Sequence, residues 1–434
     1  MHAVFEHRAR IARMLEFEAA LAQAEASVGV IPQAAADVIA AHCAVDGFDV
    51  EALAHAARNA GNLAIPVVAA LTRRVAGADR DAAGYVHWGA TSQDVIDTGL
   101  VLQLRDALVL VEADVDRLTR ILAAQARRHA NTLLAGRTWL QHALPITFGV
   151  KLAGVVGALD RHRARIQQLR ASALVVQLGG AAGTLASLHE RGIAVTDALA
   201  QRLRLGVPDM PWHTERDRVC DVAATLGMLT ATLGKLARDV SLLAQTEIGE
   251  AFEPAAPGRG GSSTMPQKRN PVGASRALAA AIRVPGLVAT MLSAAVQEHE
   301  RGLGDWAAEW ETLPQIALLA AGALEAMIEV AEGLEVHTER MRANLDATRG
   351  QIFAEAVQMA LAPSIGRDAA HALVAGACRR AVAEDAHLRD ILAREPGVSR
   401  WLDAPALDAL FDPRRYLGES GAYLERVLAS HPRD

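Results

Sequence analysis

The chain has 434 residues, too many for one small hydrophobic core. Apolar residues make up 51% of it, while aromatic residues make up only 4%. This composition predicts a protein with an aliphatic core and many helices. A net charge of −6 without long single-sign runs gives no reason to expect a nucleic-acid partner, and no uncharged apolar stretch approaches the roughly 18 residues of a membrane span. The three cysteines are widely spaced without a CxxC pair, which favours reduced thiols in a cytoplasmic protein over a zinc site.

Helices are predicted along the whole chain, and no strand pattern is evident. Residues 1–100 form short helices, interrupted by glycine and proline near residues 29–32 and 61–62. Residues 101–345 contain five stretches whose apolar residues alternate at spacings of three and four, typical of the buried seam of a long bundle helix. These stretches are 104–122, 152–176, 219–243, 278–296 and 313–334. Residues 346–434 are again short helices, separated by prolines, so we expect three all-helical domains: 1–100, 101–345 and 346–434.

The break between the third and fourth long helices carries the strongest functional signal. Its segment 261–271 reads GSSTMPQKRNP and follows further glycines and prolines, so it cannot hold a helix and is predicted to be a mobile loop. Two hydroxyls, an ammonium and a carboxamide within this loop suit an enzyme that acts on a small carboxylic acid. The alternative is a polar surface linker.

The loop resembles the signature of the fumarase/aspartase/argininosuccinate lyase superfamily. Three other segments resemble further signatures of the same superfamily: HWGATSQD at 87–94, GRTWLQHALP at 136–145 and GGAAGT at 179–184. The resemblance covers nearly the whole chain. It implies an all-α, three-domain fold whose long central bundle forms a twenty-helix core in a homotetramer, with four active sites that are each shared by three subunits.

The resemblance also implies roles for residues of these segments. Ser262 is the group that moves a proton at carbon, and Lys268 and Asn270 grip a substrate carboxylate. Because serine is a poor base, loop closure, backbone N–H groups and a nearby cation must stabilise its alkoxide. The residues implied to bind carboxylate oxygens are Thr91, Ser92, Thr138 and Gln141. Thr91 and Ser92 also fit a helix N-cap, which is compatible with binding an anion.

Two departures from the superfamily pattern indicate the reaction. Most lyases of the superfamily carry a proton-donating histidine where this chain has Trp139, although His142 follows three residues later. Amine and hydroxide leaving groups need a proton donor, whereas a carboxylate, with a pKa near 4, does not. The group that is added or expelled is therefore expected to be a carboxylate, and its intramolecular addition to a double bond is a lactonisation.

The second departure concerns the substrate. Trp306 and Trp310 occupy places where adenylosuccinate lyases bind a nucleotide phosphate, so a nucleotide is not expected; the alternative is that both indoles only pack in the core. Taken together, HERGLGDWAAEWETLP at 299–314 and RTWLQHALP at 137–145 resemble the bacterial carboxymuconate cycloisomerases, which belong to the protocatechuate branch of the beta-ketoadipate pathway. That resemblance implies a small tricarboxylic substrate and no metal or organic cofactor.

Other candidates and rival functions remain open at this point. His87, Trp139, Trp306 and Arg301 are candidate substrate contacts, and His142 either orients the substrate, shares the proton or is structural. One rival is an adenylosuccinate lyase type of elimination that releases fumarate, supported by His87, His142 and Arg301. The other rival is a catalytically inactive helical scaffold.

Overall fold

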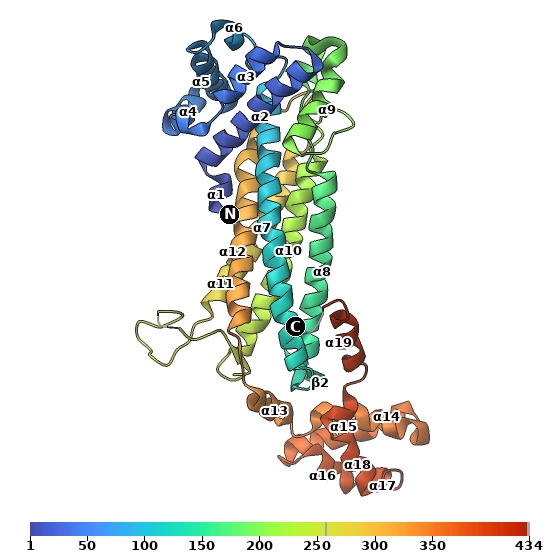
Figure 1. Ribbon diagram of the computed structural model, residues 1–434. Coiled ribbons are helices and arrows are strands. Elements are labelled where there is room, and N and C mark those ends of the chain that lie inside the picture. The colour runs from blue at the N-terminus through green and yellow to red at the C-terminus, as the bar shows by residue number, and fades with distance from the viewer. Residues whose placement is uncertain (257, 432–434) are drawn as a thin grey trace. The chain divides into compact units, whose positions relative to one another are not determined.

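The computed structural model describes residues 1–256 and 258–431, and it is dominated by helices (Figure 1). Pro257, which precedes the predicted loop at 261–271, and residues 432–434, within the predicted C-terminal domain, lie outside the described residues. The all-α prediction is confirmed. The helices of the first part are α1 His2–Phe5, α2 His7–Val28, α3 Gln33–Ala41, η1 Val45–Gly47, α4 Val50–Ala60, α5 Ala64–Ala76 and α6 Arg80–Ala83.

The middle of the chain contains the long helices, and the last part is a series of short ones. The middle elements are α7 Ser92–Arg128, β1 Leu133–Thr138, β2 Gln141–Thr147, α8 Phe148–Ser172, η2 Gly180–Ala182, η3 Ala186–Arg191, α9 Gly192–Leu203, α10 Asp217–Leu243, β3 Ala251–Phe252, α11 Val272–Ala294, α12 Asp305–Glu332 and β4 Glu335–Val336. The last elements are α13 Thr338–Asp346, η4 Gln351–Phe353, α14 Ala354–Ile365, α15 Arg367–Ala383, α16 Leu388–Ala393, α17 Pro396–Ser399, α18 Ala404–Leu410, η5 Pro413–Tyr416 and α19 Ser420–Leu428.

The chain divides into two compact units, each assembled from separate stretches of sequence. Unit 1 comprises residues 1–115, 161–233 and 277–325, and unit 2 comprises 116–160, 234–276 and 326 to the end of the described chain. Each of the five long helices contributes a segment to both units. The expected division into three consecutive domains stays a prediction.

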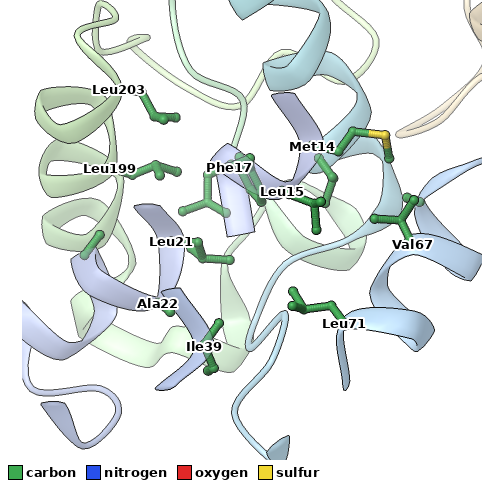
Figure 2. Close-up of a cluster of buried hydrophobic side chains, with 14 of the residues drawn as sticks. Met14, Leu15, Phe17, Leu21, Ala22, Ile39, Val67, Leu71, Leu199 and Leu203 are labelled. Carbon is green, nitrogen blue, oxygen red and sulfur yellow. The ribbon is translucent and has the colours of Figure 1, made fainter. Parts of the chain in front are cut away.

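In unit 1, helix α2 supplies the centre of a large apolar core. Met14, Leu15 and Leu21 are buried on it, and the helix packs against α3 and α9. Figure 2 shows these side chains converging with residues from α3, α5 and α9. Helix α2 ends where Gly29 adopts a φ of +78°, a left-handed conformation that favours glycine.

The long helices bury their predicted seams. All eight apolar residues of the seam on α10, from Val219 to Leu243, are buried. Neighbouring helices also meet through polar contacts: in unit 1 the His162 Nε2 lies 2.8 Å from Thr232 Oγ1, joining α8 and α10. In unit 2 Arg117 on α7 pairs with Glu332 on α12.

Helix α11 differs because its predicted seam is largely exposed. Ile282 is 75% exposed and Leu292 56% exposed, whereas the buried face of the helix is made mainly of alanines. By length and composition alone, α10, α11 and α12 could each cross a membrane, yet the most apolar stretches of α10 and α12 are 61% and 56% buried within the chain. For α11 that share is 28%.

Short strands are present where none was predicted. β1 and β2 form an antiparallel hairpin in which Thr138 pairs with Gln141, and β3 pairs with β4. The segment 133–147, in which no strand was predicted, is therefore a hairpin. Its consequence for function is that residues 138–142 are held by a ladder of backbone hydrogen bonds.

Candidate active site

The loop that contains Ser262 is closed at its base. The Asn270 backbone N–H donates to the Gly260 carbonyl at 2.8 Å, and Gly260 has a φ of +65°. A Cβ at Gly260 would lie 2.5 Å from the Asn270 carbonyl oxygen, so only glycine fits this close approach. Arg269 makes two hydrogen bonds of 2.9 Å to Glu335. These contacts fix both ends of the loop and leave residues 261–269 mostly exposed.

Two backbone N–H groups point at the Ser262 hydroxyl. Its Oγ accepts a hydrogen bond from the Met265 N–H at 3.1 Å and a longer one from the Thr264 N–H at 3.4 Å. Donors that point at an oxygen favour its deprotonated form, so this arrangement stabilises an alkoxide. Lys268 is exposed, and within the described chain its ammonium group has no hydrogen bond or ion pair. It is therefore free to bind an anion.

The hairpin of β1 and β2 presents its tip to solvent. The two turn residues, Trp139 and Leu140, are 98% and 76% exposed and have φ values of +50° and +66°. Two-residue turns with positive φ at both positions are usually Asn-Gly, and each larger residue costs about 1–2 kcal/mol there. A neighbouring contact supports this strained turn: Arg137 makes two hydrogen bonds to the buried Glu250, at 2.9 and 2.7 Å.

His142 lies behind the tip on the same hairpin. It borders a cavity of about 700 Å³ whose described lining also includes Arg137, Trp139 and Asn344 but no residue of the 254–271 loop. Burial and the positive charge of Arg137 lower the pKa of His142, against the attraction of Glu250. His142 is thus neutral at pH 7, and its buried Nδ1 has no hydrogen-bond partner among the described residues.

In unit 1, a buried carboxylate fixes the turn that contains Thr91 and Ser92. Asp94 accepts backbone hydrogen bonds from Thr91 at 2.9 Å and from Gly179 and Gly180 at 3.0 Å. It also lies 2.7 Å from the His213 Nε2. The turn is thereby tied to the glycine-rich segment 179–184.

Thr91 and Ser92 open α7, a helix of 37 residues, and both are half-buried. The start of a long helix offers unpaired N–H groups and a partial positive charge. Their hydroxyls therefore lie in a setting that suits a carboxylate.

Arg301, in the segment before α12, and Trp306, in its first turn, reach the same region. The Arg301 Nε donates to Gln93 at 3.0 Å, and its Nη2 donates to the Ala181 carbonyl at 3.1 Å, while the side chain stays exposed. Trp306 is only 8% exposed and donates its indole N–H to Asp97 at 3.0 Å. The structure thus gives Trp306 a packing role, and its contact with substrate stays a prediction.

The predicted site residues fall into two sets. Unit 1 holds His87, Thr91, Ser92, Arg301 and Trp306. Unit 2 holds the hairpin residues Thr138, Trp139, Gln141 and His142 and the loop residues Ser262, Lys268 and Asn270. Thr138 and Gln141 are exposed beside the hairpin turn, and the Asn270 Nδ2 donates to the Gly261 carbonyl at 3.4 Å. Among the described residues, no cluster of three or more His, Cys, Asp or Glu side chains could hold a metal ion.

Sequence reasoning missed the buried residues that hold these sets in place. Asp94 lies inside one of the signature segments, but no role was predicted for it. Glu250 lies outside all of the signature segments. Glu18 accepts a hydrogen bond from His87 and could have been noticed, because it interrupts the apolar stripe of α2 between Leu15 and Leu21. A carboxylate on an apolar face implies a buried partner.

Comparisons with known proteins agree with the sequence signatures. Residues 1–286 match the family model described as Lyase, and residues 350–427 match the model of the adenylosuccinate lyase C-terminus. A 3-carboxy-cis,cis-muconate cycloisomerase of Pseudomonas aeruginosa is 57% identical over 99% of this chain and 94% of its own length. The same-named protein of Bradyrhizobium diazoefficiens is 53% identical over 100% of this chain and 96% of its own length.

A solved structure is similar over the whole fold. The crystal structure of 3-carboxy-cis,cis-muconate lactonizing enzyme from Pseudomonas putida has a TM-score of 0.93 and 53% identity, and the match covers 99% of this chain and 96% of that one. The chain therefore belongs to the fumarase/aspartase/argininosuccinate lyase superfamily, and within it to the group that contains these relatives.

Proposed function

We propose that this chain catalyses the lactonisation of 3-carboxy-cis,cis-muconate to 4-carboxymuconolactone, in the protocatechuate branch of the beta-ketoadipate pathway. Relatives of that name match nearly the full length of the chain. The structural observation that carries the proposal is the hairpin tip, where the indole of Trp139 projects into solvent in place of a proton-donating imidazole. A reaction whose nucleophile or leaving group is a carboxylate needs no acid there.

In the proposed mechanism, one substrate carboxylate adds to the conjugated diene. Negative charge then collects on another carboxylate, giving an aci-carboxylate, which must be met by fixed donors. Ser262 donates the proton to carbon, and its two backbone N–H contacts stabilise the alkoxide that remains. The residues that would hold the carboxylates are Thr91, Ser92, Thr138, Gln141, Lys268, Asn270 and Arg301.

The neutral imidazole of His142 and the lack of a cofactor requirement are both compatible with this mechanism. A neutral imidazole can accept or donate a hydrogen bond to the substrate but adds no positive charge. The substrate itself supplies both the nucleophile and the electron sink, so the reaction needs no metal or organic cofactor.

The chain is further proposed to act as a cytoplasmic homotetramer with active sites shared between subunits and with three domains, 1–100, 101–345 and 346–434. The exposed apolar face of α11, with Ile282 and Leu292 as its largest members and Val296 just after the helix, supports this because it continues the seam pattern of a bundle helix without a partner among the described residues. A second copy of the same chain is the occupant that fits such a seam. The lyase superfamily provides the precedent for the tetramer.

The test is to mix the protein with 3-carboxy-cis,cis-muconate and follow the loss of the diene's ultraviolet absorbance. Turnover supports the cycloisomerase. No turnover there, together with release of fumarate from adenylosuccinate, would establish the elimination instead. Inactivity on both substrates by a folded protein would favour the inactive scaffold.

A further inference from the structure

Helix α2 carries two buried carboxyl groups on its apolar face. Glu18 and Glu25 are 1% and 0% exposed, and they are seven residues apart on a helix whose neighbouring positions are apolar. Both oxygens of Glu25 lack a hydrogen-bond partner within the described chain. Burial, with a smaller contribution from the charge of Glu18, raises the pKa of Glu25 to about 9, so this carboxyl is uncharged at neutral pH. Glu18 is therefore the one that can carry the negative charge.

The partner of Glu18 is His87, one of the candidate substrate contacts. The His87 Nδ1 lies 2.6 Å from the Glu18 Oε1, and the Glu18 side chain is fully buried while that of His87 is 18% exposed. His87 also has a φ of +60°, a strained backbone conformation for a residue other than glycine. Since Nδ1 is hydrogen-bonded to Glu18, Nε2 is the ring nitrogen that remains available to another partner. The hydrogen bond thus fixes both the ring orientation and the nitrogen that is available.

The charges around His87 favour its cationic form. Burial opposes that form, but the Glu18 carboxylate, helped by Asp94 on α7, outweighs it and raises the pKa of His87. The other titratable groups near Glu18 are Glu25 and the Cys43 thiol, whose pKa is raised to about 12 by burial and by Glu18, against the attraction of Arg74. Both are uncharged at neutral pH, and they leave Glu18 and Asp94 as the anions that face the imidazole.

We propose that Glu18 is a positioning residue for the reaction: it holds His87 by Nδ1 so that the Nε2–H of an imidazolium is presented to a carboxylate of the substrate. This proposal rests on the proposed function, because it assigns His87 to one of the substrate's carboxylates. His87 lies four residues before Thr91, whose turn is the predicted carboxylate site. Glu18 fixes the His87 imidazolium, and Asp94 anchors the neighbouring turn. His87 therefore loses little conformational freedom when the substrate carboxylate binds.

The test compares Glu18→Gln with Glu25→Gln. Glutamine keeps the size of either side chain, and Glu25 is a matched control because it lies on the same helix face, is equally buried and is already uncharged. Two quantities are measured in each protein between pH 5.5 and 8.5. One is kcat/KM for 3-carboxy-cis,cis-muconate, and the other is the titration of His87, followed by NMR of histidine labelled with carbon-13 at Cε1 and assigned with His87→Gln.

We expect Glu18→Gln to lower kcat/KM about tenfold or more at pH 8, mainly through KM, because burial without the Glu18 carboxylate lowers the pKa of His87. The loss should shrink only as pH falls toward that lowered pKa. The NMR titration of His87 should move to lower pH in the same variant. Glu25→Gln should change neither quantity appreciably. A general loss of packing would instead reduce activity without moving the titration of His87.

Several outcomes would overturn the assignment. One is an unchanged His87 titration in Glu18→Gln. Another is the same loss of kcat/KM in Glu18→Gln and in Glu25→Gln. If Glu18→Gln does not fold, the wild-type titration decides, because a His87 that loses its proton below the usual pKa of about 6.5 contradicts the pairing. Absence of turnover by the wild type refutes the proposed function alone, since the NMR experiment still tests the Glu18–His87 contact.

Discussion

The fully buried guanidinium of Arg216 should be a main determinant of stability in unit 1. It makes hydrogen bonds of 2.7 and 3.1 Å to Asp97 and of 2.9 and 2.5 Å to Glu309, and all three side chains are at most 1% exposed. Arg216→Met fills similar space but leaves two carboxyl groups buried without a cation. Removing one partner of a buried ion pair costs about 3–5 kcal/mol, which should lower the Tm by about 5 °C or more.

The loss should also depend on pH. Burial already raises the pKa of Glu309, although Arg216 acts against it, and without Arg216 that pKa should rise further. An acid whose pKa is raised in the folded protein destabilises the fold once it is ionised, so its cost is absent at low pH and grows as pH rises through the folded pKa. The Tm difference between wild type and Arg216→Met should therefore be larger at pH 8 than at pH 5.

Thermal unfolding by scanning fluorimetry at both pH values, at one fixed protein concentration, measures this difference. The control is Arg218→Met, two residues further on, which removes only a contact of 3.1 Å to the exposed Asp209 and should change the Tm little. If Arg216→Met lowered the Tm no more than this control, or equally at pH 5 and pH 8, the reasoning from the buried triad would be refuted. Since Asp97 also accepts the Trp306 N–H, the variant should lose some activity as well.

Three further predictions concern the loop, the hairpin and α11. Ser262→Ala should abolish turnover of 3-carboxy-cis,cis-muconate without changing the helical signal in circular dichroism; retained turnover would remove Ser262 from the mechanism. Leu140→Gly should relieve a φ of +66° and raise the Tm or leave it unchanged, whereas a clear decrease would mean that the turn is not strained. Ile282→Asp with Leu292→Asp should dissociate the oligomer in size-exclusion chromatography with light scattering, while Arg283→Ala on the same helix should not; an intact oligomer in the double variant would place the interface elsewhere.

The long helices could be predicted from sequence because their signal is local. The seam from Val219 to Leu243 is a strict repeat of threes and fours, and the structure buries every one of its apolar residues. The family and the all-α class were likewise predictable, since the 261–271 signature is intact and three other segments resemble further signatures, and both predictions are confirmed. The hairpin at 133–147 was missed because its turn is Trp139-Leu140, which has none of the glycine or asparagine that usually marks such a turn.

The candidate site was predictable only where a residue belongs to a signature segment. Ser262 could be named, but the two backbone donors that contact it depend on how the loop folds back between Gly260 and Asn270. Glu250 supports Arg137 from a position 113 residues away, and no local pattern reveals such a partner. The role of each signature residue in the reaction stays a prediction.

Helix α11 shows where a correct periodicity is not enough. The spacing of Leu278, Ile282, Leu292 and Val296 has the same form as the seam on α10, yet the last three of these residues are exposed, and the chain buries alanines on another side of the helix. A pattern of apolar residues indicates that a helix face is buried, but it does not indicate whether the surface that covers this face belongs to the same chain. With Ala274, Ala277 and Ala280 buried on one side and large aliphatic residues exposed on the other, α11 has two apolar faces, and a helix with two such faces needs two neighbours. The described residues supply one of them, and we expect a second copy of the chain to supply the other, so the proposed oligomer depends on the exposed face of α11.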